Sequence, residues 1–112
     1  MLRHLLKSKI HRACVTDSNL EYEGSISIAE EFMEATDLWP GEKVLVASVT
    51  SGHRLETYVQ VSPHGSKSIV INGGAAHLIK TGERVTIMAY TLSETPVDSK
   101  RILLDADNNV IG

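Results

Sequence analysis

The sequence has one cysteine, no excess of basic residues and no long apolar run, and each absence excludes a class of protein. Cys14 alone cannot form an intrachain disulfide, so nothing requires an oxidising compartment. The formal net charge of the 112 residues is −3, whereas nucleic-acid-binding domains usually carry a basic excess. No stretch has the length of a membrane span or the apolar core of a signal peptide, which predicts a cytoplasmic protein.

Common catalytic and ligand-binding motifs are also missing. The five histidines show neither H-x-x-x-H nor C-x-x-C spacing, so we expect no metal site. No G-x-S-x-G nucleophile elbow occurs, which disfavours a conventional hydrolase. Asn72-Gly73-Gly74 lacks the further glycine and lysine of a phosphate loop. Cys14, between Ala13 and Val15, is better explained as a small apolar residue than as a nucleophile.

Short alternating segments predict a mainly β protein with short helices. Residues 25–28 alternate polar and apolar, as a half-buried strand does. The S-x-x-E pattern from Ser27 to Glu30 predicts a helix start with an apolar face of Ile28, Phe32 and Ala35, stopped by Pro40-Gly41.

The remaining strands are expected between turn residues. The nearly continuous apolar run 44–49 predicts a strand buried on both sides, and Ser51-Gly52 a hairpin turn before a returning strand. Ala13 to Thr16 predicts a strand, Asp17-Ser18-Asn19 a turn, and residues 101–104 a last strand.

The chain also repeats itself. Residues 68–71 echo residues 25–28, and residues 81–89 echo residues 40–47, with a shorter helical turn between them in the second copy. Two copies of strand, helix, glycine turn and strand in so short a chain predict one closed β-barrel domain with pseudo-two-fold symmetry.

The Gly24-Ser25 bond offers the chemistry of self-cleavage. A serine hydroxyl can attack the carbonyl of the preceding residue to form an ester, and glycine leaves that carbonyl uncovered. A neighbouring hydroxyl such as that of Thr57 could stabilise the oxyanion. Elimination then frees the Gly24 carboxylate, and hydrolysis of the resulting dehydroalanine leaves a pyruvoyl group, which can form an imine and accept electrons during decarboxylation.

Four blocks resemble the signature of the pyruvoyl-dependent aspartate 1-decarboxylases, in the family's order and at its spacing: Ser8-Lys9-Ile10-His11-Arg12, Tyr22-x-Gly24-Ser25, Arg54-x-x-Thr57-Tyr58 and Asn72-Gly73-x-Ala75-Ala76. The match runs to about residue 95. It departs from the family at Ser51-Gly52, where Asn-Gly is expected, at Gly74, where alanine is expected, and in a shorter tail after Tyr90. The resemblance implies a double-psi β-barrel, a homotetramer with sites between subunits, and conversion of L-aspartate to β-alanine and CO₂ for pantothenate and coenzyme A synthesis.

The resemblance also implies a role for each matching residue. Ser25 becomes the pyruvoyl group and Gly24 the end of a 1–24 fragment, cut from 25–112. Tyr58 is the proton donor, and Thr57 assists cleavage and substrate binding. The remaining substrate-binding residues are Lys9, Arg54, Asn72, Gly73, Gly74 and Ala75, while His11 and Tyr22 support the site. No metal or pyridoxal phosphate is implied, and a helper protein for maturation is an open possibility.

One geometric expectation concerns residues 54–58. On a regular strand Arg54 and Tyr58 share a face while Thr57 points the other way. If one site uses all three, the strand is irregular there or neighbouring subunits share the residues. We therefore predict an irregularity, and regular pairing would count against the role of Thr57.

Three other interpretations remain open. Residues 25–46 also resemble the swapped-hairpin transition regulators, small DNA-binding dimers, but the acidic composition disfavours them. A pyruvoyl decarboxylase for another acidic amino acid, such as glutamate, would share this chemistry and differ in pocket length. An inactive member of the family would carry the same blocks.

Overall fold

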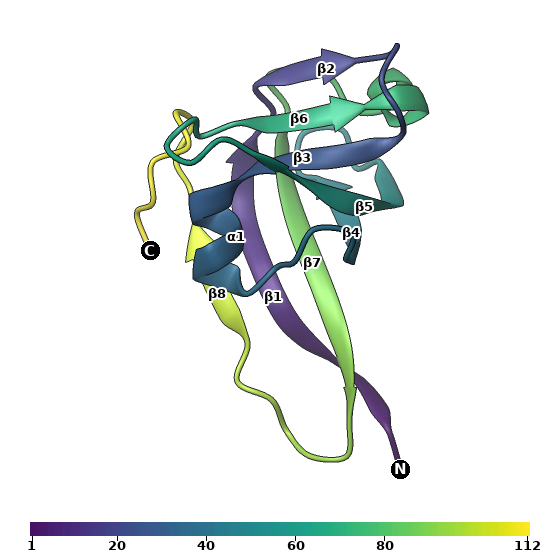
Figure 1. Ribbon diagram of the computed structural model, residues 1–112, viewed down its shortest axis with the longest axis vertical. Coiled ribbons are helices and arrows are strands. Elements are labelled where there is room, and N and C mark those ends of the chain that lie inside the picture. Colours follow the sequence, from purple (N-terminus) through teal and green to yellow (C-terminus); the bar gives the residue numbers. More distant parts are fainter.

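The computed structural model describes residues 1–112 and consists of eight strands, one α-helix and one short 3₁₀ helix (Figure 1). The elements, in chain order, are β1 (Arg3–Cys14), β2 (Asp17–Asn19), β3 (Ser25–Ala29), α1 (Glu30–Thr36), β4 (Lys43–Ser48), β5 (Arg54–Ser62), β6 (Ile69–Asn72), the 3₁₀ helix η1 (Gly73–His77), β7 (Arg84–Ser93) and β8 (Lys100–Leu103). The expectation of a mainly β protein is confirmed.

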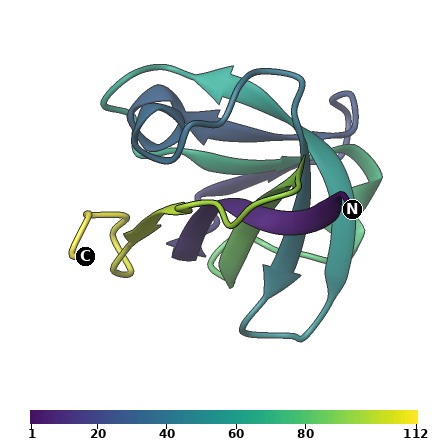
Figure 2. The ribbon, with the colours of Figure 1, turned by 90° about the horizontal axis from the view of Figure 1, so that it is seen from below.

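The strands form one sheet in the order β2-β6-β3-β5-β4-β7-β1-β8, which curls on itself. Only Val15 and Thr16 separate β1, near one end of this order, from β2 at the other end. The Val15 backbone N–H donates to the Glu83 carbonyl (2.9 Å), and the Thr16 N–H donates to the Ile69 carbonyl (2.8 Å). This link brings the ends of the sheet together around one core, consistent with the expected small barrel (Figure 2).

The predicted internal repeat appears as matched strand pairs. β3 pairs antiparallel with its counterpart β6, and β4 pairs antiparallel with its counterpart β7. The other two contacts are also matched, because β5 runs parallel to β3 and β2 runs parallel to β6. Equivalent strands that pair antiparallel are what a two-fold relation between the copies requires, in agreement with the expected pseudo-two-fold barrel.

The core follows from alternation along these strands. Ile26 and Ile28 on β3, Val46 on β4, Val59 on β5 and Ile87 on β7 are each fully buried. β-Branched side chains suit such a surface because they pack well against cross-strand neighbours. β4 alternates buried and half-buried positions, so the prediction that it is buried on both sides was wrong.

Two expectations at the N-terminal end were also wrong. β1 is a twelve-residue strand, far longer than the predicted segment 13–16, because it pairs with both β7 and β8. Its lower part and that of β7 form the long ribbon in Figure 1. Residues 17–19 form strand β2 instead of a turn, because they pair in register with residues 70–72 of β6.

The helix begins and ends differently from its prediction. Ser27 makes no capping bond, because β3 continues to Ala29, which pairs with Ser62 on β5. The helix therefore begins at Glu30. It buries Phe32, Met33 and Thr36, and leaves Ala35 exposed.

The helix stops before Pro40-Gly41. Asp37 adopts a left-handed conformation (φ 58°), and its N–H caps the carbonyls of Met33 and Glu34. The seven residues of α1 are too few for a membrane-spanning helix, and the protein has no other helix long and apolar enough to cross a bilayer.

Candidate active site

The Ser25 hydroxyl lies at the buried start of β3. Ser25 is 1 % exposed and stands opposite Asn72 in the β3·β6 register. Its Oγ donates to the Glu23 carbonyl (3.0 Å) and accepts from the Asn72 amide nitrogen Nδ2 (3.1 Å). Asn72 Nδ2 also donates to Ser27 Oγ (2.9 Å). The Ser25 hydroxyl is thus held by an amide that is itself buried.

Gly73 packs directly against this bond. Its φ of +74° lies in the left-handed region, which disfavours any side chain. A Cβ on Gly73 would also lie 2.7 Å from Gly24 Cα and 2.9 Å from Gly24 N. Only glycine therefore lets the end of β6 approach the Gly24-Ser25 segment so closely.

A hollow of about 340 Å³ opens beside Gly24. Its lining combines the Gly24 segment, strand β5 and the start of η1: Gly24, Leu55, Glu56, Thr57, Asn72, Gly74, Ala75 and Leu78. The structure thus brings the predicted residues Thr57, Gly74 and Ala75 together with the bond. Tyr22 is half exposed on the loop that precedes it.

A second group of predicted residues occupies the outer face, the side of β1, β7, β4 and β5 that points away from the core. Residues opposite each other in neighbouring strands share a face, so the register identifies its members. One row is Lys9, Met88, Leu45 and Glu56. The next row is His11, Thr86, Ala47 and Arg54, in which His11 Nδ1 lies 3.1 Å from Thr86 Oγ1. Tyr58 follows two residues beyond Glu56 on the same side of β5.

The two outer-face cations that were predicted to bind carboxylates, Lys9 and Arg54, have no acidic partner. Neither Lys9 nor Arg54 takes part in a salt bridge or a side-chain hydrogen bond. Their strands, β1 and β5, are three sheet positions apart, which is roughly 14 Å. A half-buried lysine and an exposed arginine left unpaired are suited to bind carboxylates from outside the subunit.

His11 and Tyr58 differ in their surroundings. Burial lowers the pKa of His11, and the neighbouring charges of Lys9, Arg12 and Arg84 lower this pKa further. The Tyr58 hydroxyl oxygen accepts a long hydrogen bond from Gln60 Nε2 (3.4 Å), which leaves the phenolic proton free to be donated.

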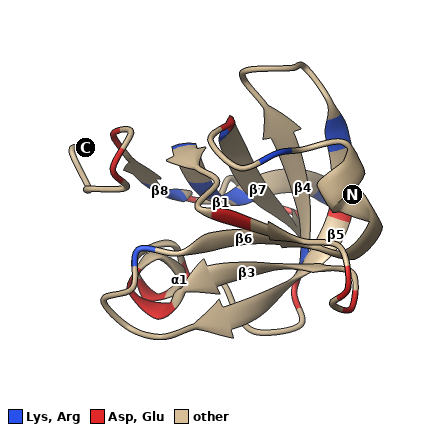
Figure 3. Cartoon of the chain, turned by 90° about the horizontal axis from the view of Figure 1, so that it is seen from above, with Lys and Arg blue, Asp and Glu red and all other residues tan.

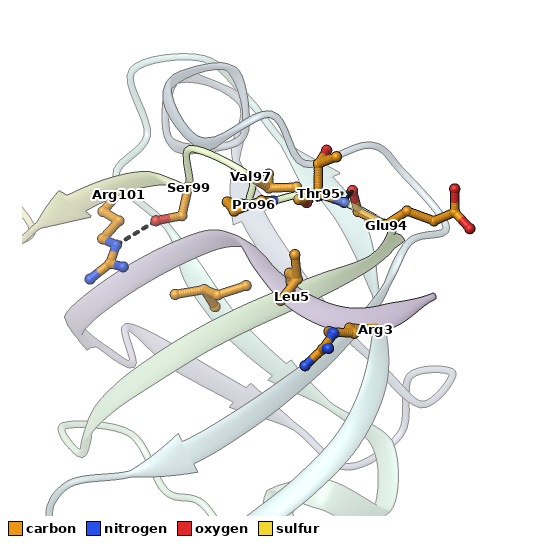
Figure 4. A pocket seen from close by; sticks show the side chains of 10 residues that line it. Arg3, Leu5, Glu94, Thr95, Pro96, Val97, Ser99 and Arg101 are labelled. Atoms are coloured by element: carbon orange, nitrogen blue, oxygen red, sulfur yellow. Dashed lines mark hydrogen bonds between the residues drawn. The ribbon is translucent and has the colours of Figure 1, made fainter. Parts of the chain in front are cut away.

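Of the outer-face residues named above, only Glu56 lines the hollow beside Gly24, and Lys9, His11, Arg54 and Tyr58 do not. Lys9 and His11 line a separate one of about 210 Å³ with Arg101, Ile102 and Leu103. The largest hollow, about 520 Å³, lies between β1, the end of β7 and residues 94–99, and holds no predicted site residue (Figure 4).

The family model for aspartate decarboxylase matches residues 1–111. The chain belongs to the aspartate decarboxylase family. A relative named aspartate 1-decarboxylase, from Thermotoga sp. (strain RQ2), is 52% identical over 99% of this chain and 97% of its own. Relatives of the same name from Caldicellulosiruptor saccharolyticus and Coprothermobacter proteolyticus are 48% and 46% identical, over 99% and 98% of this chain and 89% and 93% of their own.

Family membership decides against the DNA-binding alternative. Lysine and arginine are spread over several elements of the chain, interspersed with acidic residues that include those of α1 (Figure 3). Such a distribution does not form the basic stripe of a nucleic-acid-binding domain.

The predicted irregularity at residues 54–58 was wrong for this member of the decarboxylase family. β5 pairs regularly with β4 from Ala47–Arg54 to Lys43–Tyr58. Arg54 and Tyr58 therefore point outward while Thr57 points inward. This regularity counts against Thr57 acting beside Arg54 and Tyr58 of its own subunit, although Thr57 does lie beside Gly24.

Two residues that hydrogen-bond to predicted site residues, Ser27 and Thr86, were not predicted from the sequence. Ser27 shares the Asn72 amide with Ser25, and the alternation of strand 25–28 could have indicated this, because residues two apart face the same side. Thr86 hydrogen-bonds to His11 from a strand that lies 75 residues further along the chain, and no local sequence pattern predicts that contact.

The site contains no cluster of metal ligands. The one group of potential ligands, Glu30, Glu34 and His64, is exposed on and near α1, with ligand atoms within 4.8 Å of one another. His64 Nδ1 lies 3.5 Å from Glu30 Oε1, an ordinary surface contact. Exposed acidic groups of this kind are common without a metal.

Proposed function

We propose that this chain is a carboxy-lyase that converts L-aspartate to β-alanine and CO₂, with a pyruvoyl group derived from its own Ser25. The observation that carries the proposal is the buried Ser25 hydroxyl held by Asn72, with Gly73 packed against Gly24. Family membership over nearly the whole chain supports the substrate. We expect the reaction to take place in the cytoplasm.

The cofactor would be made by cutting Gly24-Ser25. Ser25 Oγ attacks the Gly24 carbonyl carbon and the hydroxyl proton passes to the Ser25 nitrogen, so that the peptide becomes an ester. Loss of the Ser25 Cα proton then breaks the Cβ–Oγ bond and frees the Gly24 carboxylate. Water replaces the amino group of the dehydroalanine and ammonia leaves, which yields fragments 1–24 and 25–112.

Residues around the bond fit this sequence. Asn72 fixes the position of Oγ, and the inward-facing Thr57 is a hydroxyl beside Gly24 that can stabilise the oxyanion. The hollow lined by Gly74 and Ala75 leaves room on the Gly24 side.

The outer face fits the substrate. When present, the pyruvoyl group supplies a carbonyl that accepts the electrons released as CO₂ leaves. Lys9 and Arg54, both unpaired, would hold the two carboxylates of aspartate, with Arg54 able to make a bidentate contact. Tyr58 would hold a proton at its Oη for return to the product, and His11 would line the site.

A complete site needs more than one copy of the chain. Lys9, Arg54 and Tyr58 lie on the outer face and line no hollow with Gly24, whereas the inward-facing Thr57 does line one. We propose a homotetramer in which the outer face of one subunit meets the Ser25 segment of the next. Assistance from a maturation protein is compatible with this assembly.

The first experiment is the mass of the denatured protein. Two fragments split after Gly24, the larger lighter by one ammonia than a chain beginning with serine, are expected. A matched Ser25→Ala variant should remain a single inactive chain. A wild-type chain that stays intact after warming and after mixing with host lysate would refute the proposal.

The second experiment compares aspartate with glutamate as substrate. Both acids present two carboxylates, and glutamate adds one methylene. We expect aspartate to be the better substrate by kcat/KM. A preference for glutamate would mean that the same chemistry takes place in a pocket shaped for a longer substrate.

A further inference from the structure

β1 carries both Lys9 and His11, and it loses its regular pairing immediately after them. The β1·β7 register shifts between Ile10 and Ala13, where Arg12 adopts a left-handed φ of 60°. On the other side, parallel pairing with β8 ends at His11–Leu103. The backbone of residues 12–14 therefore needs partners that its neighbouring strands provide only in part.

Arg84 supplies one of these partners. Its Nε donates to the Arg12 carbonyl (2.8 Å), and its Nη2 donates to the Leu104 carbonyl (2.8 Å). One guanidinium thus joins the bulge of β1 to the end of β8. The fixed fork of an arginine suits two separate carbonyls, which a lysine could not bridge in the same way.

Asn108 supplies the others from the C-terminal tail. Its Oδ1 accepts from the Cys14 N–H (2.7 Å), and its Nδ2 donates to the carbonyls of Cys14 (2.8 Å) and Lys67 (3.0 Å). Asn108 is 2 % exposed and has a left-handed φ of 57°, a conformation that asparagine tolerates better than most residues. The amide takes the place of a neighbouring strand for Cys14.

We propose that Arg84 and Asn108 are positioning residues that clamp the 1–24 fragment to the 25–112 fragment after cleavage, and so keep Lys9 and His11 at the site. The inference rests on the proposed self-cleavage. Both side chains belong to the larger fragment, whereas Arg12 and Cys14 belong to the smaller one. Before cleavage the peptide bond tethers the two parts, and afterwards only non-covalent contacts do.

The clamp lies directly after the two β1 residues that we expect at the substrate site, Lys9 and His11. The bulge and Cys14 follow His11 directly, so the clamp holds the backbone at the point where the regular pairing of Lys9 and His11 with β7 and β8 ends. The clamp should therefore affect substrate binding and fragment retention, more than the folding of an uncut chain.

The test uses the mature, cleaved protein and two substitutions. Arg84→Leu removes the guanidinium and keeps an apolar stem, and Asn108→Gly removes the amide while still allowing the left-handed backbone. Asn109→Gly is the matched control, because the Asn109 side chain hydrogen-bonds only to Lys67 and Asp105, both within the larger fragment. Release of the 1–24 fragment is measured by ultrafiltration at urea concentrations below the unfolding transition. KM and kcat for aspartate are measured on the same variants.

We expect the 1–24 fragment to bind about tenfold more weakly, or worse, in each clamp variant, since each loses one or more hydrogen bonds to part-buried backbone groups of that fragment. KM should rise more than kcat falls, and excess synthetic 1–24 peptide should restore activity. Asn109→Gly should behave as wild type. Retention and KM unchanged in both clamp variants would overturn the inference.

The same substitutions in the uncut Ser25→Ala chain separate positioning from general stability. There the tether makes local detachment reversible, so we expect a much smaller loss of stability than in the cut protein. An equal loss in cut and uncut chains would make the contacts merely structural and overturn the inference. A wild-type protein that never cuts would instead refute the proposed function, and the clamp with it.

Discussion

Replacing Gly73 with alanine would place a methyl group against the Gly24-Ser25 segment. The Cβ would lie 2.7 Å from Gly24 Cα, 2.9 Å from Gly24 N and 3.1 Å from the Tyr22 carbonyl oxygen, all backbone atoms that cannot rotate away. The φ of +74° adds strain that alanine does not tolerate. The substitution therefore tests both the packing around the bond and the idea that this packing prepares it for cleavage.

The magnitude follows from two contributions. A left-handed φ costs a residue with a Cβ about 1–2 kcal/mol, and overpacking of a well-packed site costs about 1–3 kcal/mol. We expect the free energy of unfolding to fall by about 2–5 kcal/mol if the barrel resists. If the 22–24 loop moves instead, the loss should be at the lower end, and the Gly24 carbonyl should shift away from Ser25 Oγ and Thr57.

Urea unfolding and the denatured mass measure the two effects on one preparation. Gly74→Ala is the control, because Gly74 has no left-handed φ and its Cβ would meet nothing within 4 Å. We expect the control to change stability by less than about 0.5 kcal/mol and to cut normally. A Gly73→Ala protein as stable as wild type and cut at the same rate would refute the reasoning.

Three further predictions test the site. Asn72→Ala should slow cleavage and destabilise the fold by about 1–3 kcal/mol, because the hydroxyls of Ser25 and Ser27 lose their shared donor. Mass spectrometry measures the cleavage and urea unfolding the stability, and an unchanged cleavage rate would contradict the prediction. Arg54→Gln should raise KM for aspartate with little effect on stability, since Arg54 is exposed and unpaired; steady-state kinetics would contradict this if KM were unaltered. The pKa of His11 should lie below 6.5, because burial lowers it first and the charges of Lys9, Arg12 and Arg84 lower it further. The contribution of His11 to stability is therefore present above pH 6.5 and lost as the pH falls through the folded-state pKa. NMR titration should show this pKa rising in Lys9→Gln, and a value at or above 6.5 in the wild type would contradict the prediction.

Local sequence patterns predicted several elements of the fold correctly. Alternation over residues 25–28 predicted β3, Ser51-Gly52 predicted the β4–β5 hairpin, and the repeat predicted the matched pairing of β3 with β6 and of β4 with β7. Side-chain alternation and turn preferences act over a few residues, so they are readable from sequence.

Predictions failed where a distant strand decided the outcome. Residues 17–19 have the composition of a turn, yet β6 pairs with them and makes them a strand. Ser27 satisfies a capping pattern, yet β5 and β6 hold it in the sheet. Backbone pairing with a partner already in place outweighs a local preference worth about 1 kcal/mol.

The sequence by itself determined the family and the chemical groups available, because four blocks around Gly24-Ser25 contain the residues that we propose as nucleophile, carboxylate-binding cations and proton donor. Only the tertiary structure decided how they are divided. The regular register of β5 sends Arg54 and Tyr58 outward and Thr57 inward, and the curl of the sheet keeps Lys9 and His11 away from the hollow beside Gly24. The clamp made by Arg84 and Asn108 is likewise invisible in the sequence, because it depends on a bulge in β1 and on a tail that returns to it across 94 residues. Which side of a sheet a residue faces is a property of pairing between strands, and pairing is settled only when the chain folds.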